Sequence, residues 1–71
     1  MASFKPKEVI SILRKLGFIQ KRQTGSHVIM YHSNKGRIVP VPLHNKDLKM
    51  GTLRSIIKHA DSTEEEFIKL K

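Results

Sequence analysis

One histidine of the sequence, His27, could transfer protons to or from a substrate. His27 follows the turn formers Thr24, Gly25 and Ser26 and begins the run HVIMYH, whose β-branched and aromatic residues predict a strand. An imidazole titrates near neutral pH, so it can act as a general acid or base. The backbone N–H groups of the turn would lie beside the ring, where they could hold a phosphate. Without further information a single histidine in a strand is more often structural than catalytic, and both interpretations stay open.

For the other three histidines, the sequence favours a structural role or leaves the choice between a structural and a functional role open. His32 borders a predicted hairpin turn, and His59 ends a predicted helix, where the dipole favours a protonated ring. His44 lies in a polar loop, where it could contact a ligand or brace the loop. No histidine pair has the helical i, i+4 spacing of a zinc protease, and the chain has no cysteine. We therefore expect no metal, no disulfide and no cofactor.

The charge of the chain is strongly positive and unevenly distributed. The chain has fourteen Lys and Arg residues and six Asp and Glu residues, which gives a formal net charge of +8. Residues 1–60 hold twelve basic and two acidic side chains (+10), whereas residues 61–71 hold two basic and four acidic ones (−2). A basic body of this kind favours a polyanionic partner, most simply nucleic acid. Solubility alone, or an acidic protein partner, would also fit the charge.

Apolar periodicity predicts two amphipathic helices and a short third one. Pro6 suits the first turn of a helix within residues 3–17, and Gly17 suits its end. A second helix should start at Gly51-Thr52, where the free N–H groups could seat a phosphate or Thr52 could simply cap the helix; capping is the favoured interpretation. Residues 61–71 begin with a capping box, Ser62 with Glu65. The apolar stripes consist of Val9, Ile12, Leu13 and Leu16, and of Leu53, Ile56, Ile57 and Ala60.

Three short strands are predicted between the helices, at residues 18–23, 27–32 and 37–42, the last two joined by a turn at 33–36. Pro40 and Pro42 predict that the third strand lies at an edge of the sheet or ends early. Alternation puts His27 on one face with Ile29 and Tyr31. We expect an α+β domain, α-β-β-β-α, with a three-stranded antiparallel sheet and two helices on one face. Residues 1–71 would form one domain, with 61–71 as a C-terminal tail helix. Because no apolar run approaches a membrane span, we expect a soluble, cytoplasmic protein without membrane contact.

Three segments resemble the HicA family of bacterial and archaeal toxins, the mRNA interferases of HicA/HicB toxin–antitoxin systems. They are TGSHVIMYH, VPVPLH and KDLKMGTLRSIIKHA, which follow the order and spacing of the family between residue 6 and about residue 60. The resemblance implies a fold like that of double-stranded-RNA-binding domains, metal-independent endoribonuclease activity on mRNA, and inhibition by a HicB-like antitoxin. It also implies that the toxin is a monomer alone and forms a hetero-oligomer with the antitoxin. The motif Gly25-Ser26-His27 marks His27 as the catalytic residue, although Val28 stands where many relatives have a histidine or a polar residue.

RNA carries its own nucleophile, the 2′-hydroxyl, so His27 would need only to move protons while cations stabilise the extra charge. Lys21, Arg22 and Arg37 are the candidates for that charge stabilisation. Lys46, Lys49, Arg54 and Lys58 could line a surface for the RNA backbone. The predicted substrate-binding residues are Lys21, Arg22, Gly25, Ser26, Arg37, His44, Lys46 and Arg54. Two other functions stay open: a non-catalytic RNA-binding module of the same fold, and a protein-interaction domain that meets an acidic partner.

Overall fold

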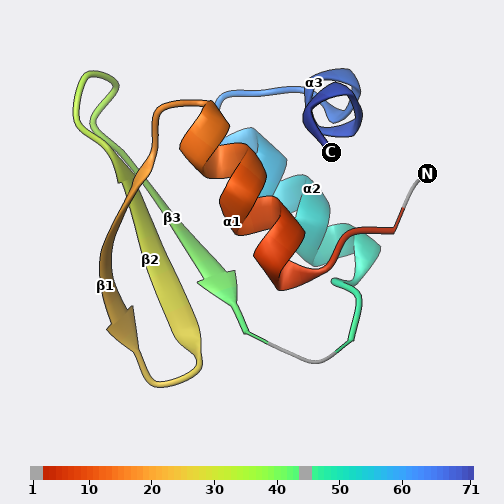
Figure 1. Cartoon of the computed structure of the whole chain (residues 1–71), viewed down its shortest axis with the longest axis horizontal. Helices are drawn as coiled ribbons and strands as arrows, with labels where there is room; N and C mark the ends of the chain where they lie inside the picture. The colour runs from red at the N-terminus through yellow and green to blue at the C-terminus, as the bar shows by residue number, and fades with distance from the viewer. Residues whose placement is uncertain (1–2, 44–45) are drawn as a thin grey trace.

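A computed structural model describes residues 3–43 and 46–71 (Figure 1). The order of elements is the expected one, in the α+β class. Among the described residues, each helix is too short or too polar to span a bilayer. The elements are α1 (Pro6–Lys15), β1 (Ile19–Thr24), β2 (His27–His32), β3 (Arg37–Pro42), α2 (Met50–His59) and α3 (Glu64–Leu70).

The ends of α1 follow from its sequence. Pro6 occupies the first turn, where a missing N–H costs nothing, and the Glu8 carboxylate accepts a hydrogen bond of 2.9 Å from the backbone N–H of Lys5. Gly17 follows the helix with φ +98°, as predicted for a left-handed cap. A Cβ at this position would lie 2.8 Å from Nε2 of His32, so the glycine also makes room for that ring. The His32 ring also meets that of Phe18 edge to face, at a centroid distance of 5.1 Å.

The sheet is antiparallel, with the strand order β1-β2-β3. The strand β3 is at an edge, as Pro40 and Pro42 require. In the register between β2 and β3, His27 pairs with Pro42, and Ile29 pairs with Pro40. Pairing between β1 and β2 shifts by one residue at Lys21, which lies between Gln20 and Arg22 in a bulge.

The helices pack on one face of the sheet, and the core lies between the helices and the sheet (Figure 1). Val28 and Met30 of β2 point into this core, and so do Val39 and Val41 of β3. The alternation of a strand then directs His27 away from the core, and its side chain is exposed. The core is built from β2, β3 and the apolar stripes of the helices, whereas every residue of β1 is exposed.

The C-terminal helix α3 is docked on the body of the protein. Phe67 is completely buried, and its ring meets that of Phe4 edge to face at a centroid distance of 6.3 Å. The cap is Thr63, whose hydroxyl accepts a hydrogen bond of 3.1 Å from the Glu66 backbone N–H. The predicted capping box with Ser62 is therefore wrong by one residue: Ser62 precedes the cap, and its hydroxyl donates to the Glu66 carboxylate instead.

Candidate active site and nucleic-acid interface

His27 lies at the first position of β2, on the exposed side of the sheet. The preceding turn depends on Gly25, which has φ +55°. The backbone N–H of Leu43 donates to the Ser26 carbonyl at 2.6 Å, which ties this turn to the chain leaving β3. The next residue, Val28, is buried and anchors the strand. A rigid element thus presents the ring of His27 to solvent.

The ring of His27 lines a hollow of about 400 Å³ between the edge strand β3 and helix α2. We call it the histidine hollow, because His59 of α2 lines it as well. Its other lining residues are Val39, Pro40 and Pro42 of β3, and Thr52, Ser55 and Ile56 of α2. Of these eight residues, only the two histidines have ionisable side chains.

His59 is one of the two histidines for which the sequence favoured a structural role. Its Nδ1 lies 2.7 Å from the Ser55 carbonyl oxygen and 3.3 Å from the Ser55 hydroxyl. A carbonyl oxygen only accepts hydrogen bonds, so Nδ1 carries the hydrogen and Nε2 is the ring nitrogen left for a ligand. His59 reaches the same hollow as His27 because α2 runs back along β3, and no local pattern in the sequence predicts that approach.

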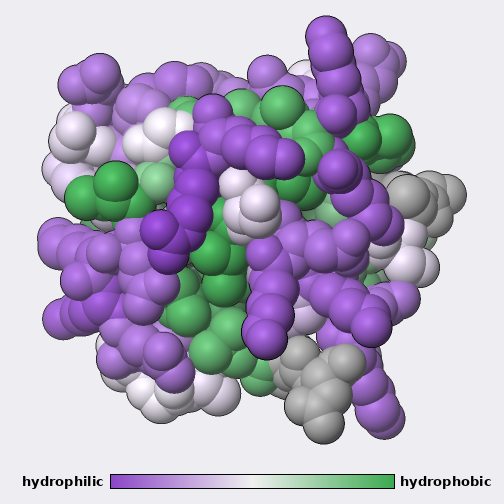
Figure 2. Space-filling model, in the orientation of Figure 1, coloured by the Kyte–Doolittle hydropathy of each residue, from purple (hydrophilic) through white to green (hydrophobic). Residues whose placement is uncertain are grey.

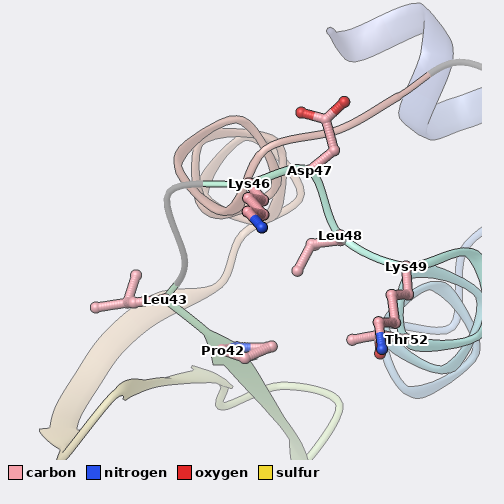
Figure 3. A pocket seen from close by; sticks show the side chains of 7 residues that line it. All are labelled: Pro42, Leu43, Lys46, Asp47, Leu48, Lys49 and Thr52. Carbon is pink, nitrogen blue, oxygen red and sulfur yellow. The ribbon is translucent and has the colours of Figure 1, made fainter.

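A second hollow of about 660 Å³ continues from the first, and Pro42 and Thr52 line both. Figure 3 shows the Lys46 side chain directed into this hollow, whereas the Asp47 carboxylate points away from it. Lys49 lines the side formed by the start of α2 (Figure 3). The hollow therefore offers positive charge to a ligand.

A third hollow of about 740 Å³ adjoins the other end, and Ser55 and His59 line both it and the histidine hollow. The cations Arg37, Arg54 and Lys58 also line it, and so does the carboxylate residue Asp61. Two of these three cations already have partners at the surface. Arg37 lies 3.9 Å from Asp61 and donates to the His59 carbonyl at 3.3 Å, and Arg54 lies 3.6 Å from Glu64. Exposed ion pairs of this kind are weak and exchange readily for a phosphate.

Other predicted site residues lie away from the histidine hollow. The amine of Lys21 stands over the Tyr31 ring, 4.8 Å from its centroid, and Arg22 pairs in register with Ile29. Both belong to β1, at the opposite edge of the sheet from β3. Arg37 begins β3, whereas His27 pairs with its last residue. His44 lies outside the described residues.

The start of α2 differs from the prediction. The helix begins at Met50, its N-cap residue is Lys49, and the cap residue makes no side-chain hydrogen bond. Thr52 is therefore inside the first turn, and its assignment as the cap is wrong. Thr52 lines two of the hollows and does not cap the helix.

The surface around these elements is mainly hydrophilic. Figure 2 shows hydrophilic side chains over most of one face, with apolar surface emerging between the sheet and the helices.

Within residues 3–43 and 46–71, no three His, Asp or Glu side chains gather in a way that could hold a metal ion.

Comparison with protein families gives one match. A family model described as "HicA toxin of bacterial toxin-antitoxin" matches residues 6–61. No curated protein matches the chain.

Proposed function

Because the chain belongs to the HicA toxin family of bacterial toxin–antitoxin systems, we propose that it is a metal-independent endoribonuclease that cleaves mRNA with His27 as a general acid or base. Membership of the family makes the chain a toxin with a cognate antitoxin. The observation that carries the enzymatic proposal is the position of His27. Its ring is exposed, lines a hollow and is held by a strand whose next residue is in the core.

The proposed reaction uses the 2′-hydroxyl of the RNA as the nucleophile. The 2′-oxygen forms a bond to phosphorus as its proton is removed, and the bond from phosphorus to the 5′-oxygen breaks as that oxygen gains a proton. The products are a 2′,3′-cyclic phosphate and a 5′-hydroxyl. His27 performs one of these two proton transfers, which contributes on the order of 10²–10⁴-fold in rate.

Negative charge builds up on the phosphoryl oxygens during this reaction. The backbone N–H groups of the Gly25-Ser26 turn stand beside His27 in the sequence and are suited to hold one such oxygen. Lys46 adds a positive charge from the adjoining hollow (Figure 3). These groups, together with the exposed imidazole, favour an enzyme over a passive RNA-binding module.

The proposed partner is a HicB-like antitoxin that covers the histidine hollow and forms a hetero-oligomer with a toxin that is monomeric alone. Its surface should carry acidic groups opposite Lys46, Lys49 and Lys58, because complementary charge accelerates association. We place this encounter, and the mRNA substrate, in the cytoplasm.

The deciding experiment compares the wild type with His27→Ala, each purified and incubated with mRNA in EDTA. We expect the wild type to degrade the RNA and the variant to lose this activity while it keeps its RNA affinity. Equal cleavage by the variant would remove His27 from the catalytic role. If neither protein cleaves RNA and both bind it with strong salt dependence, the chain is a non-catalytic RNA-binding module instead.

A further inference from the structure

The two histidines of the hollow are linked to opposite ends of β3. His27 pairs with Pro42, the last residue of that strand, whereas the side chain of Arg37, its first residue, bonds to the His59 carbonyl. Five residue steps of strand, roughly 16 Å, separate Pro42 from Arg37.

The histidine hollow lies between the other two and shares lining residues with each. Pro42 and Thr52 line both it and the second hollow, and Ser55 and His59 line both it and the third. We call the three together the β3–α2 groove. Apolar residues such as Pro40 and Ile56 line its middle together with the two histidines, Thr52 and Ser55. One end carries Lys46, Lys49 and Asp47, and the other carries Arg37, Arg54, Lys58 and Asp61. A partly apolar middle between ends of net positive charge suits a chain of bases and sugars with regularly spaced phosphates.

We propose that the β3–α2 groove holds a single strand of RNA, with the cleaved linkage at His27 and a neighbouring phosphate on His59. This proposal rests on the proposed nuclease function and assigns the path of its substrate. A hollow of about 400 Å³ has the size of a small-ligand site. It accepts a nucleotide or two of an unpaired strand, whereas a duplex would have to lie outside it.

His59 is a positioning residue in this arrangement. Because Nδ1 donates to the Ser55 carbonyl, a protonated ring has its second N–H, on Nε2, left for a ligand. A hydrogen bond from an imidazolium to a phosphate is charge-assisted. His59 should therefore strengthen RNA binding and leave the proton transfers at His27 unchanged.

The test uses an eight-nucleotide single-stranded RNA made of 2′-O-methyl residues, which lacks the nucleophile and cannot be cleaved. Its affinity is measured by fluorescence anisotropy for the wild type, His59→Gln and the control Lys69→Gln, an exposed cation on α3. We expect His59→Gln to lose roughly tenfold in affinity. Lys69→Gln should stay within about twofold, after allowance for the general charge effect.

Kinetics separate positioning from chemistry. With a cleavable RNA of the same length, His59→Gln should raise KM and leave kcat within about twofold. With a dinucleotide, whose single phosphate is the linkage at His27, the variant and the wild type should be equal. Lys58→Gln, on the same helix, should also weaken binding of the eight-nucleotide RNA, which keeps the test decisive if His59→Gln does not fold.

Unchanged affinity of a folded His59→Gln, or equal competition by a duplex of the same length, would overturn the groove proposal. The two proposals fail in different ways. If His27→Ala abolishes cleavage and His59→Gln has no effect, the nuclease proposal is supported and the groove proposal is wrong. If the wild type cleaves no RNA but its affinity for the single strand depends on His59, the groove proposal is supported and the nuclease proposal is wrong.

Discussion

Replacement of Phe67 by alanine tests whether α3 belongs to the stable core. The Phe67 side chain is fully buried and meets Phe4 edge to face. Removal of a buried phenylalanine costs about 3–5 kcal/mol. A 71-residue domain has a total stability of roughly 4–11 kcal/mol. Since 1 kcal/mol shifts the melting temperature of a domain this size by about 4–8 °C, we expect Phe67→Ala to melt roughly 12–40 °C below the wild type.

The assay is thermal and urea unfolding followed by circular dichroism, with Ile68→Ala as the matched control. Ile68 is the next residue of α3 and is 48% exposed, so its truncation should change the free energy of unfolding by less than about 1 kcal/mol. A drop of only a few degrees for Phe67→Ala, or equal drops for the two variants, would refute the docking of α3.

Two further predictions concern the turn glycines and the charge of the groove. Gly17→Ala should destabilise the protein more than Gly25→Ala: both residues have positive φ, which costs an alanine about 1–2 kcal/mol, but only at Gly17 would the new Cβ meet a ring, that of His32. Equal melting temperatures of the two variants would contradict this. Lys46→Gln should reduce the slope of log affinity against log salt for a non-cleavable single-stranded RNA by about 0.7, and an unchanged slope would show that Lys46 contacts no phosphate.

Local patterns in the sequence predict most of the fold. The apolar stripe of α1 and the glycine after it define that helix, and the two prolines of β3 predict an edge strand. Boundaries were less accurate. The strand β1 starts and ends one residue later than predicted, and the caps of α2 and α3 are Lys49 and Thr63 rather than Thr52 and Ser62. Cap identity depends on backbone angles that tertiary packing sets, so residue type alone does not determine it.

The candidate site was only partly predictable. Alternation along β2 allowed His27 to be exposed, but which face of the strand meets the core became clear only from the burial of Val28 and Met30. The approach of His59 to the same hollow requires α2 to run back along β3, which no residue spacing encodes. Lys21 has an alternative partner in Tyr31, and this contact could not be read from their distance in the sequence.

The chemistry at His27 is tested most directly by the ends of the cleaved RNA. The wild type, in EDTA, should produce 2′,3′-cyclic phosphate and 5′-hydroxyl ends, and His27→Ala should produce them at least ~10²-fold more slowly. A single 2′-O-methyl group at the scissile position should block the wild type. Cleavage of that blocked linkage, or products with 3′-hydroxyl and 5′-phosphate ends, would show that water rather than the ribose attacks and would contradict the role assigned to His27.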